Sequence, residues 1–282
     1  MTTDQTAPTS VDPGAPIRAR AQVVSNLSEG EANHRIELRV ERWPQWQPGQ
    51  FVMLAPGAES AAPRYDPLLP RPMAIYTADS KGNFDQVSVL YKVEGRGTRL
   101  LAAAEPGEHV RMVGPLGTGF ELPPEGHHAI LVGGGTGTAS LYSLARAALE
   151  RGPVSVILGA RRAALLMAES DFEKLGAKLH IVTEDGSRGE QGLVTDVLGP
   201  LLAEGGDPAI VYACGPTPMM RACHRLTREA GVSCRVALEN RMACGFGACL
   251  GCAVPMAEGG FSLVCKQGPV YDADTLEWEG IP

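Results

Sequence analysis

The chain has 282 residues, of which 44% are hydrophobic, so it is long enough for two domains and a small appendage. Its formal net charge of −7 argues against a nucleic-acid partner, because proteins that bind nucleic acids usually carry a basic face. No apolar run reaches the roughly 18 residues that a membrane span requires, so no membrane partner is expected either.

The N-terminal segment, residues 1–16, has the sequence MTTDQTAPTSVDPGAP. It is polar and contains proline, which is typical of a disordered tail. It also lacks the positive start and the apolar stretch of a signal peptide. This lack of an export signal, together with the odd number of cysteines, 7, predicts a cytoplasmic protein with reduced thiols.

Residues 17–125 are rich in short runs of alternating polarity, separated by Gly, Pro and Asn turns; the runs are IRARAQVVS, HRIELRV, QFVMLA, FDQVSVLYKV and HVRMVG. Regular short strands with turn signals predict a β-barrel or a β-sandwich. One helix is expected among these strands, from Gly97 to Ala104, with Thr98 as its N-cap and Pro106 after its end.

From residue 126 the pattern changes to buried apolar strands that alternate with helices. A strand, a glycine turn and a helix are expected in AILVGGGTGTASLYSLARAALERG, and further strands in VSVILGARR, LHIVTED, AIVYACGP and CRVALEN. Another helix is predicted over residues 217–230. This alternation predicts a parallel, doubly wound α/β sheet. We place this domain at residues 126–238, followed by a small cysteine module at residues 239–282.

A glycine-rich turn joins the first of these strands to its helix and consists of Gly133, Gly134, Gly135, Thr136 and Gly137. Such a turn lets the pyrophosphate of a dinucleotide approach backbone N–H groups at a helix N-terminus. The strict G-x-G-x-x-G pattern is not met. Tight packing between the strand and the helix is therefore an alternative explanation of the glycines.

The strand after this helix ends in Arg161 and Arg162 and lacks the acid that usually binds the ribose of NAD. These arginines leave NADP open as the nucleotide, although surface charge is the favoured interpretation. Asp185, Gly186 and Ser187 follow the next strand, and they either face the nucleotide or form a polar loop.

Four cysteines near the C-terminus have the spacing of a metal centre. They are Cys244, Cys249, Cys252 and Cys265, in the pattern C-x4-C-x2-C-x12-C. The first three match the spacing with which plant-type ferredoxins hold a 2Fe-2S cluster, and the fourth ligand comes from further along the chain. Structural zinc is the alternative, but zinc sites usually show two C-x2-4-C pairs, whereas only Cys249 and Cys252 form one here.

Taken together, these segments resemble the ferredoxin-reductase superfamily, in which a flavin-binding β-barrel precedes a nicotinamide-nucleotide domain. Within it, the chain is similar to the electron-transfer subunits of class 1B dihydroorotate dehydrogenases. The resemblance covers about residues 17–272 and rests on the cysteine pattern and on RPMAIY, LYKVEGRGTRLL, GPLGTGF, LVGGGTGTASLYSLA, TEDGSRGEQGLVTDVL and YACGPTPMM. It implies a β-barrel FAD domain over residues 17–125, an NAD-binding α/β domain over 126–238 and a 2Fe-2S module over 239–282.

The resemblance also assigns residues to the cofactors. Arg71 would bind the FAD pyrophosphate, and the other expected FAD residues are Pro72, Met73, Ala74, Leu90, Tyr91, Lys92, Gly97 and Thr98. The superfamily usually has Ser or Thr at the position of Ala74, so the backbone would replace that contact. The turn near the nicotinamide ring matches Cys214, Gly215 and Pro216, where Cys214 would have a positional and not a nucleophilic role. Cys223 and Cys234 are expected to be ordinary buried thiols.

For function, the resemblance implies an oxidoreductase subunit that relays electrons to NAD+ from an FMN-containing dihydroorotate dehydrogenase, which forms orotate. Electrons would pass singly through the 2Fe-2S cluster to FAD and leave as a hydride, so no catalytic acid or base is needed in this chain. The expected assembly is a heterotetramer with two copies of each subunit. The apolar loop from Phe246 to Leu250 is the expected docking face.

Other functions remain open at this point. The same relay could serve a hydrogenase or a ferredoxin–NADP transhydrogenase, or the chain could be a stand-alone reductase with soluble acceptors. A non-redox module that binds zinc through the four cysteines is the alternative of a different class.

Overall fold

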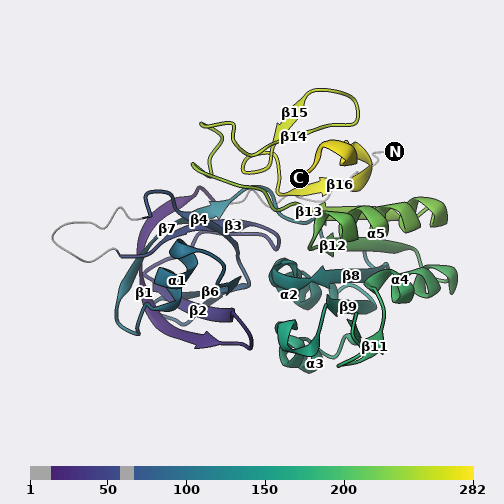
Figure 1. The fold of residues 1–282 in the computed structure, drawn as a ribbon, viewed down its shortest axis with the longest axis horizontal. Coiled ribbons are helices and arrows are strands. Elements are labelled where there is room, and N and C mark those ends of the chain that lie inside the picture. Colours follow the sequence, from purple (N-terminus) through teal and green to yellow (C-terminus); the bar gives the residue numbers. More distant parts are fainter. Residues whose placement is uncertain (1–13, 58–66) are drawn as a thin grey trace, which may run out of the picture.

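A computed structural model describes residues 14–57 and 67–282 of the chain. The predicted disordered tail, residues 1–16, lies outside the described residues except for its last three, which form no helix or strand. Figure 1 shows a curled sheet on the left, an α/β sheet at the lower right and the C-terminal segment above both. No helix in these described parts of the chain is both long and apolar enough to cross a membrane.

The first sheet is antiparallel throughout. Within the described residues 14–57 and 67–116, seven strands follow the order β4-β3-β7-β1-β2-β6-β5. Inward-facing residues such as Val23, Leu38 and Val89 alternate with outward-facing ones and form a core of their own. The strands are β1 (Ile17–Ser28), β2 (Asn33–Val40), β3 (Phe51–Ala55), β4 (Arg71–Ala74), β5 (Thr77–Ser80), β6 (Asp85–Lys92) and β7 (His109–Leu116).

This sheet curls until its two edge strands approach each other. β4 and β5 lie at opposite edges, yet only Ile75 and Tyr76 separate them in the chain. The amide of Ile75 donates to the carbonyl of Gln50, next to β3, and the amide of Tyr76 donates to the carbonyl of Ser88 on β6. The chain therefore passes directly from one edge strand to the other. The predicted barrel is confirmed in the form of a curled half-barrel.

The helix predicted from Gly97 to Ala104 is present, but it begins and ends earlier, as α1 (Arg96–Ala102). Its N-cap is Gly95, so the prediction that Thr98 caps the helix was wrong. Thr98 is the third helical residue, and its hydroxyl accepts hydrogen bonds of 3.0 Å from the amides of Glu94 and Gly95. The hydroxyl reaches back to donors before the helix, which is one half of a capping box.

The second sheet is parallel except at one edge. Across residues 128–272, all of them described, seven strands follow the order β11-β10-β9-β8-β12-β13-β16, and β16 runs antiparallel to β13. The chain order reverses between β8 and β12, so the predicted doubly wound sheet is confirmed. The strands are β8 (His128–Gly134), β9 (Val154–Ala160), β10 (Lys178–Thr183), β11 (Glu190–Gln191), β12 (Ala209–Cys214), β13 (Ser233–Ala237) and β16 (Val270–Asp272).

Helices cover both faces of this sheet. In β8, Ala129 and Leu131 pack toward α2 and α3, whereas Ile130 and Val132 pack toward α4 and α5. Because both faces are buried, the strands are apolar along their whole length, which made them recognisable in the sequence. The helices are η1 (Gly135–Gly137), α2 (Thr138–Ala148), η2 (Ala163–Leu165), α3 (Glu169–Leu175), α4 (Val194–Ala203) and α5 (Thr217–Ala230), of which α5 has the predicted bounds.

The C-terminal segment packs on both sheets. Its buried residues Cys252 and Cys265 belong to one apolar cluster with Met53 and Leu116 of the curled sheet and Val236 of β13. The cysteine region is therefore anchored in the core of the protein. The elements of this segment before and after β16 are β14 (Ala253–Pro255), β15 (Phe261–Leu263), η3 (Ala273–Thr275) and η4 (Trp278–Gly280).

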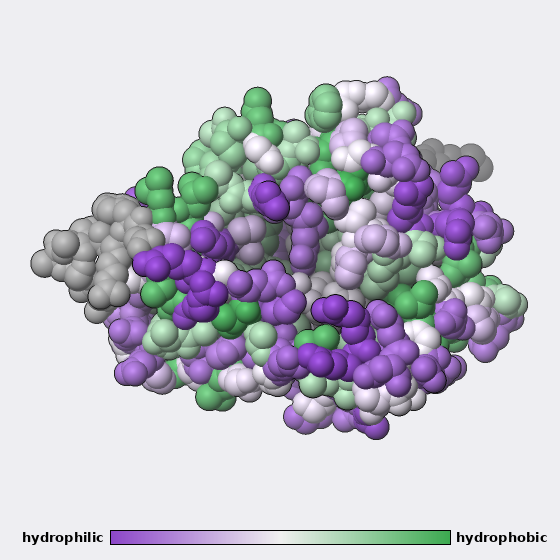
Figure 2. Space-filling view, viewed as in Figure 1, coloured by the Kyte–Doolittle hydropathy of each residue, from purple (hydrophilic) through white to green (hydrophobic). Residues whose placement is uncertain are grey.

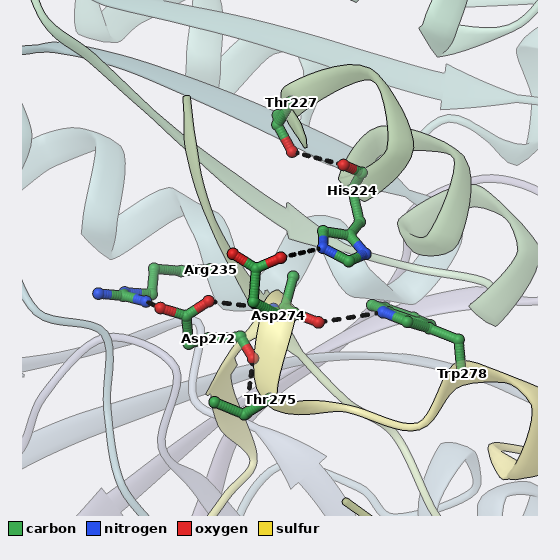
Figure 3. A network of polar contacts seen from close by, with 8 residues as sticks. His224, Thr227, Arg235, Asp272, Asp274, Thr275 and Trp278 are labelled. Atoms are coloured by element: carbon green, nitrogen blue, oxygen red, sulfur yellow. Dashed lines mark hydrogen bonds and ion pairs between the residues drawn. The ribbon is translucent and has the colours of Figure 1, made fainter. Parts of the chain in front are cut away.

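A network of polar contacts holds the end of the chain against α5 and β13 (Figure 3). His224 on α5 hydrogen-bonds to Asp274 at 2.8 Å and stacks on the ring of Trp278. Further along, the hydroxyl of Thr217 at the start of α5 donates to the carbonyl of Pro282 at 2.7 Å. These contacts fix the last residues beside the carboxyl end of β12.

Candidate cofactor sites

A cleft of about 530 Å³ lies where the curled sheet, the α/β sheet and the C-terminal segment meet. Arg241 and Met242, which precede the cysteines, form part of its wall, as does Cys214 at the end of β12. The fold thus gathers segments that are far apart in the sequence. The predicted FAD residues on its wall are Arg71, Pro72, Met73 and Ala74 of β4, Leu90, Tyr91 and Lys92 of β6, and Thr98 of α1.

Gly97 is buried behind this cleft and determines where Arg71 lies. A Cβ at position 97 would be 2.7 Å from Nε and 2.8 Å from Cζ of Arg71, so a larger residue would displace the guanidinium. Nη1 of Arg71 donates to the carbonyl of Leu69 at 2.5 Å, which holds the group at the wall. A guanidinium has five N–H donors, so others remain for an anion such as a pyrophosphate.

A second cleft, of about 690 Å³, lies at the carboxyl ends of the parallel strands β8, β9, β10 and β12. Of the predicted nucleotide residues, it is lined by Gly134, Gly135, Thr136, Gly215 and Pro216. In open α/β sheets, nucleotides bind at this edge, where the strand order reverses. The second cleft therefore has the position of a nucleotide site.

The glycines of the turn after β8 divide into two roles. Gly133 and Gly137 provide close packing, since a Cβ on Gly137 would be 2.3 Å from the carbonyl carbon of Cys214. Gly134 and Gly135 line the second cleft, and Gly135 has a φ of +56°, in the region that favours glycine. The turn thus combines tight strand–helix packing with an open wall on the cleft.

The two clefts meet at a shared wall. The turn after β12 crosses this junction, because Cys214 lines the first cleft, whereas Gly215 and Pro216 line the second. A flavin in the first cleft and a nicotinamide in the second would therefore meet here. The residues that line both clefts are Lys92, Glu94, Thr136, Glu239 and Pro282.

Cys214 is a buried, neutral thiol at this junction. Its Sγ donates to the carbonyl of Ala237 at 3.4 Å. Burial raises the pKa of Cys214 to about 12, and the nearby Glu239 carboxylate adds to the effect. A thiol with such a pKa stays protonated at neutral pH and is a poor nucleophile, which suits a positional role.

Glu239 is a residue of the junction that the sequence did not reveal. Its Oε1 accepts a hydrogen bond of 3.3 Å from the hydroxyl of Thr136, and its side chain remains exposed to the open cleft. Desolvation by the surrounding walls nevertheless raises the pKa of Glu239; the Thr136 hydrogen bond opposes this, and the Glu94 carboxylate adds to it. No motif marks Glu239, because its place depends on β13 lying near the turn after β8.

The four cysteines predicted as cluster ligands lie in the C-terminal segment as two pairs. The amide of Cys249 donates to the sulfur of Cys244, and the amide of Cys265 donates to Sγ of Cys252 at 3.5 Å. Among the residues that the structure describes, no group of three or more His, Cys, Asp and Glu side chains converges on a single metal position. A 2Fe-2S cluster takes two ligands on each iron, whereas structural zinc takes four around one ion. Two neighbouring pairs of cysteines are the division of ligands that the two irons of a 2Fe-2S cluster would need.

The loop between the first two of these cysteines directs amides at a thiolate. Although burial acts in the opposite direction, hydrogen bonds from the amides of Phe246, Cys249 and Ala248 lower the pKa of Cys244 to about 6. Gly245 and Gly247 have φ angles of +80° and +89°, which lets the backbone wrap in this way. Such N–H groups stabilise the thiolate form that an iron–sulfur cluster requires.

The cysteine site adjoins the first cleft. Met242 lines that cleft and is only two residues from Cys244. A Cβ on Gly245 would lie 2.6 Å from Cγ of Met53, so the cysteine loop packs directly on β3. Cys249 is exposed, Cys244 is half-buried, and Cys252 and Cys265 are buried.

Two other expectations concern residues away from these sites. Cys223 and Cys234 are buried thiols, as predicted. The hydroxyl of Ser187 donates to Asp185 at 2.6 Å and accepts from the amide of Ala163 at 2.8 Å. Asp185 and Ser187 therefore bond within and beside their own loop, and neither lines the second cleft.

Two family models match the chain. Residues 239–277 match the iron-sulfur cluster binding domain of dihydroorotate dehydrogenase B, and residues 131–225 match the oxidoreductase NAD-binding domain. Both matches contain residues that the structure places at the sites described above.

Known relatives extend over most of the chain. The dihydroorotate dehydrogenase B (NAD(+)) electron transfer subunit of Bacillus caldolyticus is 42% identical over 232 residues, which is 80% of this chain and 85% of the relative. The subunit of the same name from Geobacillus thermodenitrificans (strain NG80-2) is 40% identical over 262 residues, 91% of this chain and 97% of the relative.

Solved structures are similar as well. An NADH-dependent reduced ferredoxin-NADP oxidoreductase has a TM-score of 0.79 at 28% identity, covering 93% of this chain and 91% of that chain. An Amycolatopsis cytochrome P450 reductase has a TM-score of 0.63 at 23% identity, covering 77% of this chain and 67% of that chain, and shares the fold.

Proposed function

Since the chain belongs to the family of dihydroorotate dehydrogenase B (NAD(+)) electron transfer subunits, we propose that it relays electrons from a catalytic partner subunit to NAD+. The partner contains FMN and oxidises dihydroorotate to orotate, in pyrimidine biosynthesis. The observation that carries the proposal is the unbroken series of sites. The cysteine site adjoins the first cleft at Met242, and the first cleft opens into the second at Glu239.

The chain holds its cofactors at fixed positions along this series. When bound, a 2Fe-2S cluster carries single electrons, and FAD exchanges single electrons as well as a hydride. Arg71 binds the FAD pyrophosphate, with its guanidinium held in place against Gly97. The remaining FAD residues are Pro72, Met73, Ala74, Leu90, Tyr91, Lys92 and Thr98, and the cluster ligands are Cys244, Cys249, Cys252 and Cys265.

The nucleotide takes the second cleft. The turn of Gly134, Gly135 and Thr136 offers backbone N–H groups to its pyrophosphate, at the start of η1 and α2. Gly215 and Pro216 guide the nicotinamide end toward the junction, where Cys214 forms the wall on the flavin side. Gly133 and Gly137 support this turn through packing. We divide the chain accordingly at residues 125 and 238.

The partner docks on the exposed apolar surface of the cysteine segment. Phe246, Leu250 and Phe261 are 64%, 63% and 78% exposed, and Figure 2 shows apolar side chains at the upper edge, where Figure 1 places β14 and β15. Leu250 has a φ of +58°, an unfavourable conformation for leucine, right after the exposed Cys249. The assembly is a cytoplasmic heterotetramer with two copies of each subunit, and it involves neither membrane nor nucleic acid.

Anaerobic purification of the chain with its partner tests this function. The complex should contain FAD and about two cluster irons per copy of this chain, and it should form orotate with NAD+ as acceptor. Recovery with a hydrogenase, and without orotate formation, would assign the relay to another partner. A colourless protein with bound zinc would exclude a redox role.

A matched pair of variants tests the docking face. Leu250→Asp should weaken assembly with the partner while FAD and iron contents stay normal. Leu27→Asp is the control, because Leu27 is 64% exposed but lies on β1 of the curled sheet. Equal assembly of the two variants would place the docking face elsewhere.

A further inference from the structure

The second cleft has two ends that the strand order distinguishes. Its end at β8 and β12 joins the first cleft, so a nicotinamide ring belongs there. Its other end lies over β9 and β10, where Arg161, Leu165, Glu184 and Leu193 form the wall. Neighbouring strands are about 4.8 Å apart, so β10 is roughly 10 Å from β8. The adenosine end of an extended dinucleotide therefore reaches β9 and β10.

Glu184 and Arg161 stand side by side at this adenosine end. The amide of Glu184 donates to the carbonyl of Ala160 at 3.1 Å, and the amide of Asp185 donates to the carbonyl of Arg161 at 3.3 Å. The two residues thus follow adjacent strands, and both line the cleft. In the described part of the chain, the ribose of the nucleotide would meet the carboxylate of Glu184 and the guanidinium of Arg161 at this end.

The other arginines of these loops are used elsewhere. Arg162 forms an ion pair of 2.6 Å with Glu31, in the turn between β1 and β2. Arg188 forms two hydrogen bonds, of 2.8 and 2.5 Å, with Glu169 on α3. A 2′-phosphate has a charge of about −1.5 to −2 and is usually recognised by clustered arginines. Among the residues that the structure describes, the wall at this end of the cleft has no such cluster of arginines, and Glu184 adds a negative charge there.

We propose that Glu184 selects NAD over NADP. Its carboxylate accepts hydrogen bonds from the ribose hydroxyls of NAD and repels the 2′-phosphate of NADP. The acid comes from the end of the third parallel strand in the chain, β10, and not from the end of the second, where Arg161 and Arg162 are found. This inference rests on the proposed function, because it takes the second cleft as the nicotinamide-nucleotide site.

Titration calorimetry with the full-length chain tests the proposal without redox chemistry. The probes are ADP-ribose and its 2′-phosphorylated form. The wild-type chain should bind ADP-ribose more tightly, and Glu184→Gln should reduce the ratio of the two affinities by about tenfold, because one repelling charge is removed. Arg161→Gln, added to Glu184→Gln, should weaken binding of the phosphorylated probe alone.

Glu190→Gln is the control, because it removes the same charge from the exposed strand β11, which does not line the cleft. This variant should keep the wild-type ratio. If the Glu184 and Glu190 variants have equal ratios of the two affinities, or if the wild-type chain prefers the phosphorylated probe, Glu184 does not select NAD. The proposed function would still stand after either result. If neither probe binds the wild-type chain, the second cleft is not a nucleotide site, and the proposed function is wrong as well.

Discussion

The hydroxyl of Tyr76 donates a hydrogen bond of 2.7 Å to the carboxylate of Asp171, and this bond joins the two sheets that form the clefts. Tyr76 links β4 to β5 in the curled sheet, whereas Asp171 lies on α3 of the α/β sheet. Arg35 of β2 contacts the same carboxylate oxygen at 2.6 Å. Although burial acts in the opposite direction, these two partners lower the pKa of Asp171. The contact therefore fixes one sheet against the other.

Asp171→Asn should lower the free energy of unfolding by about 2 kcal/mol at pH 7, because it weakens the hydrogen bonds of Tyr76 and Arg35 to this carboxylate and leaves the half-buried Arg35 paired with Glu29. A carboxyl whose pKa is lowered by folding adds stability above its unfolded pKa, near 3.8, and this contribution disappears as the pH falls through the folded pKa. Denaturant unfolding at pH 7 and at pH 3 should show the difference between variant and wild type shrinking in acid.

The control for this prediction is Asp79→Asn. Asp79 also joins the two sheets, through an ion pair of 3.1 Å with Arg146, but the side chains are 38% and 45% exposed. Such exposed pairs contribute about 0–1 kcal/mol. Equal destabilisation by the two substitutions, or a difference that does not change with pH, would contradict the role given to Asp171.

Gly97→Ala should reduce the FAD content of the purified protein, because the added Cβ would lie 2.7 Å from Nε of Arg71 and displace the guanidinium. The measurement is flavin absorbance per chain, with circular dichroism to confirm the fold. Gly95→Ala is the matched control, since a Cβ there would have none of the described residues within 4 Å. Full flavin content in the Gly97 variant would remove Arg71 from the proposed FAD site.

Gly245→Ala should destabilise the protein by about 1–3 kcal/mol more than Gly259→Ala. Both glycines have positive φ angles, +80° and +91°, so both variants strain the backbone. Only at position 245 would the Cβ collide with a neighbour, 2.6 Å from Cγ of Met53. Thermal unfolding gives the comparison, and slower reduction of FAD through the cluster is expected in the Gly245 variant alone. Identical unfolding of the two variants would show that the loop does not depend on its packing against β3.

Cys249→Ser should lower the iron content and remove the visible absorption of the cluster, because the exposed Cys249 is one of the four proposed ligands. Cys223→Ser should keep both, since Cys223 is a buried thiol on α5. Iron analysis and spectroscopy under anaerobic conditions distinguish the two results. Retained iron in the Cys249 variant would require a different ligand set.

Many helices and strands were predictable, because each depends on the pattern of apolar residues in a short stretch of sequence. The β10 strand appears in the sequence as LHIVTED and the α5 helix as residues 217–230, since burial on both faces or on one face leaves a periodic pattern. The start of α1 was mispredicted, because a threonine side chain can bond to backbone amides either from the N-cap position or from the third helical residue. Sequence spacing does not distinguish these two arrangements.

The sequence by itself determined the local chemistry of this protein: a set of cysteines within 22 residues, from Cys244 to Cys265, and a glycine turn between a strand and a helix. Only the tertiary structure decided how these sites are connected. Tyr76 reaches Asp171 across 95 residues of sequence, and Thr136 reaches Glu239 across 103. Such contacts depend on how the two sheets pack together, and no local pattern of residues encodes that packing.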